Sequence, residues 1–337
     1  MNTSTLTSPR DVQSANQISK SKSTFRETLG AGVGGPLVGL VLIIALMSAI
    51  APNFTNPKNL INIVDQVTVI GVLALGATAV IIIGGIDLSV GAVLAFSTMV
   101  LGWVSHDLGA PMWMAILIAI ACGTAMGILN GVGVAIAKLP SFIATLAMMS
   151  IARGLANIFS DGQQIVGYPD WFFGLSSERY LGYFSLTATI FILLYAAGWI
   201  FFKYRTGGRA LYAIGGNPEV ARLAGLHVKK VTIWVYATAG TLAGIGGVML
   251  ASRLDSSQPS AGSGYELDVI AAVVIGGASL AGGKGRVTGT IIGVLIIGAL
   301  RNGLNLLGTP SYVQQVIIGL VIAAAVMIDV LRRKKSA

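Results

Sequence analysis

Residues 112–136 read MWMAILIAIACGTAMGILNGVGVAI, an apolar run without a charged side chain. A helix needs about 20 largely apolar residues to cross the hydrocarbon core of a bilayer, so this run predicts a transmembrane helix. Gly123, Gly127 and Gly131 recur within it at a spacing of four, and small residues at this spacing let membrane helices pack closely. Cys122, the only cysteine of the chain, excludes an internal disulfide and is expected to be a packing residue.

The composition of the whole chain also indicates a protein that lies in a lipid bilayer. Hydrophobic residues make up 54% of the 337 residues and charged residues 10%, against about 25% charged in an ordinary soluble domain. A water-exposed globule of this size would lack polar surface. The formal net charge of +9 does not indicate nucleic-acid binding, because the basic residues sit in short loops between apolar runs.

Nine further apolar stretches bring the number of predicted spans to about ten. They cover residues 34–51, 63–83, 89–104, 141–159, 184–202, 231–251, 266–280, 287–307 and 312–331. The stretches at 89–104 and 266–280 are short, so each is expected to be either a full span or a broken, re-entrant segment. The chain is therefore predicted to be an all-α polytopic membrane protein. Its transmembrane domain covers 34–331, between a disordered cytoplasmic tail at 1–33 and a basic cytoplasmic tail at 332–337.

The distribution of Lys and Arg orients these spans. With ten spans, both termini lie on one side of the membrane. If that side is the cytoplasm, only Lys58, Arg179 and Arg253 fall outside. Arg153 and Arg301 fall within spans, and the other 17 of the 22 Lys and Arg residues lie inside. This asymmetry follows the positive-inside rule, so both termini are predicted to be cytoplasmic.

The chain contains no pattern for driving transport or doing chemistry by itself. All acidic residues fall in loops or near predicted span ends, and His106 and His227 fall in loops, whereas ion-driven transporters use carboxylates or histidines at mid-bilayer depth. The nearest approach to a Walker A loop is 282–285 (GGKG), which lacks the Ser or Thr and the first Gly of that motif. No cluster of His, Cys or acidic residues suggests a metal site or an enzyme centre.

The largest predicted cytoplasmic loop, 203–230, is expected to contain a short helix over about 218–224. Asn217 is a favoured N-cap, Pro218 a favoured first residue and Gly225 a favoured C-terminal stop. Such a short helix needs something to pack against. It either packs on its own membrane domain or docks as a coupling helix in a groove of an ATPase. In the second case the coupling residues are Asn217, Pro218, Glu219, Ala221, Arg222, Leu223 and Gly225.

Five motifs in order resemble the ribose-type permeases of ATP-binding-cassette (ABC) importers, and the similarity runs from about residue 52 to the C-terminus. The motifs are 85–91 (GIDLSVG), 216–225 (GNPEVARLAG), 264–268 (GYELD), 276–286 (GGASLAGGKGR) and 302–308 (NGLNLLG). Two departures are visible. Val220 is bulkier than the expected small residue, and Arg301 stands at what resembles an Asn position of the family, where it bears on substrate choice.

The resemblance implies a permease subunit in the bacterial inner membrane that acts as a homodimer. It also implies a cytoplasmic ATPase with paired nucleotide-binding domains, which holds ATP and Mg²⁺, and a periplasmic or tethered sugar-binding protein. The chain itself is then not an enzyme and carries no cofactor. The expected solute is a monosaccharide such as ribose, or a similar sugar or polyol.

Two charged residues, Asp87 and Arg153, each have two alternative predicted roles. Asp87, at the predicted cytoplasmic end of the second span, either caps the next helix or contacts a gating or coupling surface. Arg153, within the fifth predicted span, either borders the translocation path or bonds carbonyl groups of a broken neighbouring helix. The candidate gate and path residues are Asp87, Ser89, Asn130 and Arg153, with Ser141 and Thr145 as further lining candidates by polarity.

Candidate contacts with the binding protein lie on the predicted outer side. The longest outside loop, 160–183, is rich in aromatic residues such as Trp171, which suit the membrane–water interface and equally a docking surface. Glu266 and Asp268 begin the eighth predicted span, where carboxylates also complement the positive end of a helix. The three candidates for this contact are therefore Trp171, Glu266 and Asp268.

Two other classes of protein compete with the importer subunit. A channel or facilitator that works without ATP would transport solute alone, and it would leave the capped helix at 218–224 unexplained. A membrane enzyme is disfavoured because the chain lacks a cluster of catalytic side chains.

Overall fold

The computed structural model describes residues 34–180 and 184–334. The predicted tail at 1–33 lies outside the described residues, as do 335–337. Each of the ten predicted apolar stretches coincides with a helix, and 332–334 continue the last one. The helices are α2 (Gly34–Ile50), α3 (Pro57–Ile82), α4 (Val90–His106), α5 (Met112–Ala135), α6 (Ser141–Ile158), α7 (Asp170–Ser177), α8 (Leu186–Tyr204), α9 (Thr206–Gly216), α10 (Pro218–Leu223), α11 (Val228–Leu254), α12 (Tyr265–Ile275), α13 (Val287–Leu306) and α14 (Ser311–Lys334).

Six of the described helices are long and apolar enough to cross a membrane, namely α3, α5, α6, α8, α11 and α13. Shorter apolar helices are α2, α4 and residues 311–324 of α14. The 11 residues of α12 give a length of about 16 Å, roughly half the thickness of the hydrocarbon core. The stretch at 266–280 is therefore a short helix and not a full-span one.

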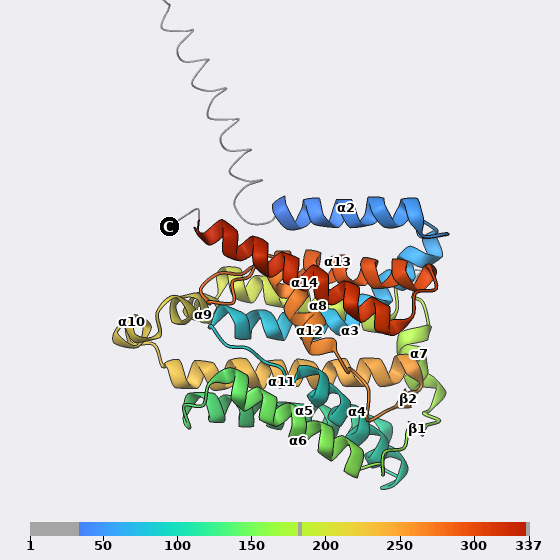
Figure 1. Ribbon diagram of the computed structural model, residues 1–337. Helices are drawn as coiled ribbons and strands as arrows, with labels where there is room; N and C mark the ends of the chain where they lie inside the picture. Colours follow the sequence, from blue (N-terminus) through green and yellow to red (C-terminus); the bar gives the residue numbers. More distant parts are fainter. Residues whose placement is uncertain (1–33, 181–183, 335–337) are drawn as a thin grey trace, which may run out of the picture.

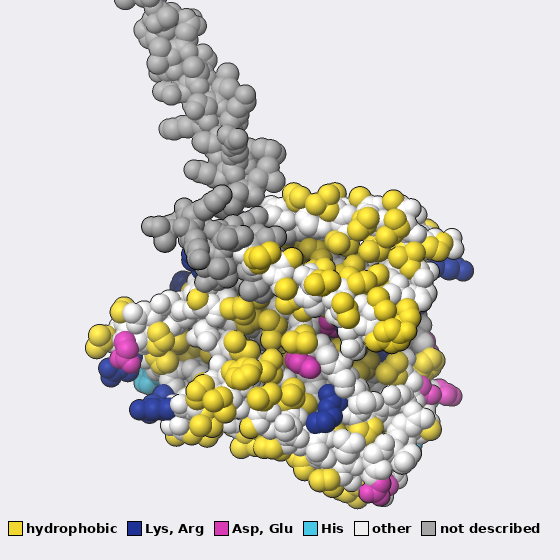
Figure 2. All heavy atoms as spheres, in the orientation of Figure 1, with side chains coloured by type: hydrophobic (Ala, Val, Ile, Leu, Met, Phe, Trp, Pro, Cys, Tyr) yellow, Lys and Arg dark blue, Asp and Glu magenta, His cyan; other side chains and the backbone are white. Residues whose placement is uncertain are grey.

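Three of these helices form the centre of the bundle. In the most apolar part of α3, 89% of the residues are buried, and the share is 72% in α11 and α13, against at most 33% in α5, α6 and α8. Because α3 packs against both α11 and α13, the three form a continuous core (Figure 1). The outer helices expose large apolar side chains such as Leu129 and Leu193, as lipid-facing helices do. Figure 2 shows hydrophobic side chains over much of the visible face.

The glycines of residues 112–136 build a close contact between α5 and α11. A Cβ on Gly127 would lie 2.3 Å from the carbonyl oxygen of Tyr236, and one on Gly240 would lie 2.3 Å from that of Gly123. No side chain fits between the two backbones. The packing role predicted from the spacing of four is confirmed. Cys122 is half-buried and packs against the hydrophobic core.

The loops predicted to be cytoplasmic and outside gather at opposite ends of the bundle. In Figure 1, α9 and α10 lie at the left end, and α7, β1 (Ile165–Val166) and β2 (Ser256–Ser257) lie at the right end. The two strands pair antiparallel. The hydroxyl oxygens of Tyr168 and Ser257 lie 2.6 Å apart, and burial raises the pKa of Tyr168 to about 12. This hydrogen bond joins the loop before α7 to the segment after α11, and the two form one cap at this end of the bundle.

Candidate coupling and translocation sites

The short helix expected in the loop at 203–230 is present as α10. The side-chain oxygen of Asn217 accepts hydrogen bonds from the backbone N–H groups of Glu219 and Val220, at 3.0 and 3.1 Å. The helix begins at Pro218, and Gly225 adopts a φ of +87° beyond its end. These are the capping features that the sequence predicts. They hold a six-residue helix that would not persist alone.

Most of the α10 surface is exposed. Ala221 is 3% exposed and packs towards the body of the protein, whereas Val220 is 60% and Leu223 79% exposed. Arg222 donates to the Glu219 carboxylate at 2.9 Å on the same exposed surface. The helix therefore attaches by one side and offers an apolar pair flanked by an ion pair, at the left tip of the molecule in Figure 1.

The helix α9, which precedes α10, was not predicted. Its sequence TGGRALYAIGG contains four glycines, which disfavour a helix, but Leu211 and Ile214 are buried at a spacing of three. The hydroxyl of Tyr212 donates to the carbonyl oxygen of Gly285 at 3.0 Å. Gly283 N–H donates to the Ile82 carbonyl at 2.8 Å. Helix α9 contacts α10 and is called its platform below. This platform is bonded to the loop before α13, and the loop is bonded to the end of α3.

An unwound segment, residues 83–89, joins α3 to α4 and carries a buried polar network. The Asp87 carboxylate accepts from both the backbone N–H and the hydroxyl of Ser89, at 2.8 and 2.6 Å. Asn130 of α5 donates to the Ser89 hydroxyl at 2.8 Å. All three side chains are at most 5% exposed. Asn130 Oδ1 is buried and accepts no hydrogen bond from a described residue.

The position of Asp87 corrects two expectations. It lines a small cavity with Gly240, which lies at the middle of the 27-residue helix α11, so it lies well inside the bundle and not at a span end. Nor does Asp87 cap α4, because the N-cap residue is Ser89. The Asp87 side chain instead closes a local turn onto the residue two positions later. The prediction that all acidic residues fall in loops or near span ends therefore needs correction for Asp87, which lies in an irregular segment inside the bundle.

Ser141 and Thr145 of α6 satisfy the backbone of the same segment. The Ser141 hydroxyl accepts from Ile86 N–H, and the Thr145 hydroxyl accepts from Leu88 N–H, both at 3.2 Å. Backbone polar groups without water must be paired inside the protein. The two residues were expected to line the path on polarity alone. The structure shows that their hydroxyls bond the irregular backbone.

A second irregular segment, residues 258–264, leads into α12 and meets the start of α4. A Cβ on Gly91 would lie 2.4 Å from the carbonyl oxygen of Gly262, so the two backbones touch there. Arg153 of α6 donates to the carbonyl oxygens of Pro259 and Ala261, at 2.5 and 2.9 Å. Of the two roles considered for Arg153, the bonding of carbonyls in a broken segment is confirmed.

The carboxylates of α12 differ in their surroundings. Asp268 is 1% exposed and accepts from the guanidinium of Arg301 in α13, so its side chain has no surface to offer a binding protein. That expectation was wrong because Asp268 lies on the side of α12 that faces Arg301, whereas the neighbouring Leu267 is exposed. Glu266 is half-buried beside Gly91 and interacts electrostatically with Arg153. Trp171 of α7 is 52% exposed and remains a candidate for partner contact.

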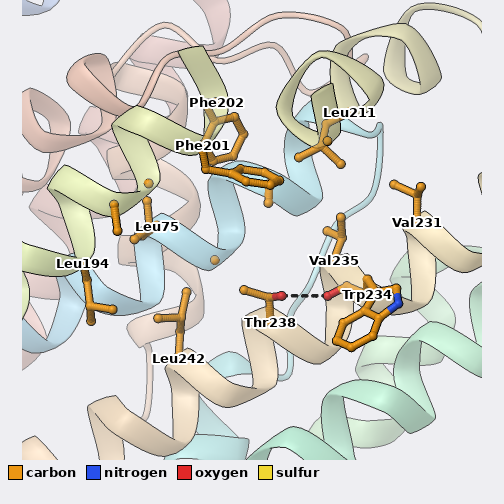
Figure 3. Close-up of a pocket in the computed structure, with 15 residues that line it drawn as sticks. Leu75, Leu194, Phe201, Phe202, Leu211, Val231, Trp234, Val235, Thr238 and Leu242 are labelled. Atoms are coloured by element: carbon orange, nitrogen blue, oxygen red, sulfur yellow. Dashed lines mark hydrogen bonds between the residues drawn. The ribbon is translucent and has the colours of Figure 1, made fainter. Parts of the chain in front are cut away.

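An apolar cavity of about 540 Å³ lies between α3, α8, α9 and α11 (Figure 3). Its wall includes Phe201, Leu211 and Trp234. The Thr238 hydroxyl in this wall already donates to the Trp234 carbonyl, at 2.8 Å. A sugar needs several convergent polar groups. This cavity therefore does not suit a hydrophilic solute. Among the described residues no group of His, Cys, Asp and Glu could hold a metal ion.

The membrane-length apolar helices, with two buried irregular segments between them, indicate a polytopic membrane protein. The model of the family described as "branched-chain amino acid transport system / permease component" matches residues 59–326. The chain belongs to this permease family. The resemblance drawn from the five motifs is confirmed by individual relatives.

The chain is 44% identical over 305 residues to the ribose import permease protein RbsC of Bacillus subtilis, which covers 90% of this chain and 93% of the relative. It is 43% identical over 297 residues to RbsC of Escherichia coli K12, covering 87% and 92% of the two chains. Identity to the L-arabinose ABC transporter permease protein AraH of Azospirillum brasilense is 35% over 301 residues, with coverage of 89% and 88%. No solved structure matches the chain.

Proposed function

We propose that this chain is the membrane-spanning subunit of an ABC importer for a monosaccharide, with ribose or a similar sugar or polyol as the solute. The observation that carries the proposal is the similarity to ribose import permeases over about nine-tenths of the chain. Relatives named for arabinose and fructose support a sugar-like solute without fixing which one.

The subunit works with three partners under this proposal. A second copy completes the translocation path between two permeases in the bacterial cytoplasmic membrane. An extracytoplasmic binding protein delivers the sugar to the outer cap, where Trp171 is exposed. A cytoplasmic ATPase with two nucleotide-binding domains holds ATP and Mg²⁺. The permease then needs neither a cofactor nor a catalytic residue of its own.

We assign coupling to α10. Its exposed Val220 and Leu223 form the apolar side of a helix that fits a groove, and the Glu219–Arg222 pair gives that surface a charge pattern. Movement of α10 would pass to α9 and to the loop before α13 through the Tyr212–Gly285 hydrogen bond. ATP-driven closure of the ATPase would thus reach the transmembrane helices.

We place the path along the two irregular segments, 83–89 and 258–264. Irregular backbone at membrane depth occurs where protein or a water-filled cavity surrounds it. Asp87, Ser89 and Asn130 would offer few and weak polar contacts there, which suits a solute that must leave again. Most of the specificity would then reside in the binding protein, and the two permeases would alternate access to either side.

The test is co-purification from native membranes, compared between wild type, Glu219→Lys and Glu178→Lys. Both variants reverse the charge of an exposed glutamate, but Glu178 lies at the outer end of the bundle. We expect an ATPase with two nucleotide-binding domains to purify with wild type and with Glu178→Lys. We expect Glu219→Lys to reach the membrane but to lose the ATPase and sugar uptake.

Two results would contradict the proposal. Retention of the ATPase by Glu219→Lys would remove the coupling role of α10 while leaving the importer assignment intact. Passage of sugar through liposomes that contain the chain alone, without ATP, would replace the importer with a facilitator.

A further inference from the structure

A second cavity, of about 340 Å³, lies at the cytoplasmic end of α8. Its lining comes from Trp199, Phe202 and Lys203 of α8, Tyr212 of α9, and Arg286 with Val287 and Thr288 at the start of α13. The cavity thus lies where two membrane-spanning helices meet the platform that carries α10. It differs from the apolar cavity of Figure 3, because it contains cations, hydroxyl groups and aromatic rings together.

The cations of this cavity have no anionic partner in the described part of the chain. No acidic residue lines the cavity, and neither Lys203 nor Arg286 forms an ion pair with a described residue. Lys203 Nζ lies 4.6 Å from the ring centre of Trp199 and 5.2 Å from that of Tyr204. Aromatic rings hold the ammonium in place without neutralising it.

The beginning of α13 adds positive potential to the same place. This helix has 20 residues, and its first turn contains no acidic side chain. Its first backbone N–H groups lack helical carbonyl partners, and the helix dipole favours an anion at this end. Two cations and the end of a long helix therefore converge on one cavity with no counter-charge.

An exposed stripe on α8 leads from the membrane to this cavity. Ile192, Ala196, Trp199 and Lys203 follow one another at helical spacing, and all four are exposed. The stripe is apolar until it reaches Lys203. Trp199 lies at the junction, and tryptophan prefers the boundary between hydrocarbon and headgroups. The acyl chains of a phospholipid would fit the apolar stripe, and its anionic headgroup would then lie in the cavity at the end of the stripe.

We propose that the cavity binds the headgroup of an anionic phospholipid, with its phosphate between Lys203 and Arg286 and an acyl chain along Ile192 and Ala196 of α8. A soluble anion would not need the apolar stripe, and a zwitterionic lipid would not need two free cations. If α10 couples to an ATPase as proposed above, the lipid would also brace its platform, because Tyr212 lines the cavity and bonds Gly285.

Lipid binding is measured on the purified, delipidated full-length chain by native mass spectrometry. Phosphatidylglycerol and phosphatidylcholine are titrated separately onto wild type, Lys203→Gln/Arg286→Gln and Lys229→Gln/Lys230→Gln. The last variant removes two exposed cations from the first turn of α11, at the same end of the molecule but outside the cavity. Because the assay uses the chain alone, its outcome does not depend on transport or on the ATPase.

We expect wild type and the α11 variant to prefer phosphatidylglycerol. Lys203→Gln/Arg286→Gln should lose about fivefold in its affinity for this lipid per cation, or about 25-fold in all. Arg286→Lys keeps the charge and should keep the preference, which separates lipid binding from folding defects. The melting temperature of each variant in detergent is recorded alongside.

Three results would overturn the proposal. The first is equal retention of both lipids by wild type. The second is loss of phosphatidylglycerol to millimolar inorganic phosphate, which would assign the cavity to soluble anions. The third is a Lys203→Gln/Arg286→Gln variant that binds phosphatidylglycerol as tightly as wild type does, which would show that the two cations do not hold the headgroup.

Discussion

The guanidinium of Arg301 donates to the carboxylate of Asp268, which joins α13 to α12 inside the bundle. Asp268 is 1% exposed, and the Nε of Arg301 is itself buried without a partner among the described residues. The buried Asp268 carboxylate therefore depends on Arg301 for its counter-charge, although part of the Arg301 side chain is exposed. Arg301 stands where the family resemblance suggests Asn. The ion pair with Asp268 gives this arginine a structural role within the chain.

Neutralising one member of the Asp268–Arg301 pair should destabilise the fold strongly. Arg301→Gln leaves a buried carboxylate without its counter-charge, which costs about 3–5 kcal/mol. We expect a large fall in the melting temperature of the detergent-solubilised protein. Asp268→Asn/Arg301→Gln removes both charges and should recover most of that loss. A double variant as unstable as the single one would show that the pair does not act as a unit.

Replacement of Asp87 by Asn should affect stability less than replacement by Ala. Both hydrogen bonds from Ser89 reach one carboxylate oxygen, and Asp87→Asn retains an oxygen at that place. Asp87→Ala instead leaves a buried N–H and a hydroxyl without their acceptor, at a cost of about 1–3 kcal/mol. We expect wild-type stability and uptake for Asn, and lower stability for Ala. Loss of uptake by a stable Asp87→Asn would mean that transport uses the negative charge.

Arg153→Met should loosen residues 258–264. The substitution removes two donors from the carbonyl oxygens of Pro259 and Ala261, and hydrogen bonds from charged groups are worth about 1.5–3 kcal/mol. Hydrogen exchange should accelerate in this segment and not in the other loops. Arg205→Met, at an exposed position between α8 and α9, is the matched control. Unchanged exchange in Arg153→Met would mean that the segment is held by other contacts.

A single methyl group on Gly127 should separate α5 from α11. A Cβ there would overlap the Tyr236 carbonyl, and overpacking of this kind costs about 1–3 kcal/mol. Gly154→Ala in α6 is the control, because nothing lies within 4 Å of its Cβ position. We expect a lower melting temperature for Gly127→Ala alone. Equal melting temperatures would show that the helices separate without cost.

Features that depend on local sequence could be predicted. Apolar runs fall on helices because burial in lipid depends on the residues of one segment, as 112–136 illustrates. The cap of α10 was predictable because Asn217, Pro218 and Gly225 lie within nine consecutive residues and act on the local backbone. The burial of Ala221 against the body of the protein was not, since it depends on contacts made by the folded chain.

Features that depend on distant partners could not be predicted. A count of apolar residues along the chain places 84–88 in a loop between two spans, but hydrogen bonds to Ser141, Thr145 and Asn130 hold residues 83–89 inside the bundle. The same holds for Asp268, whose burial depends on Arg301 of the following helix. Helix α9 was not predicted because its glycines have a low helix propensity. Propensity does not include the burial of Leu211 and Ile214 in the folded chain, which stabilises this helix.

The partners of the two irregular segments also have a consequence for biosynthesis. Residues 83–89 leave the ribosome before Asn130, Ser141 and Thr145 exist, and before α11 can cover Asp87. Exposed to lipid at that stage, their unpaired backbone groups would cost several kcal/mol each. The carbonyl groups that bond Arg153 likewise lie more than a hundred residues downstream and are synthesised later. We therefore expect α4 to linger at the insertion machinery or at the membrane surface, and to settle only when α6 and α11 have entered the bilayer.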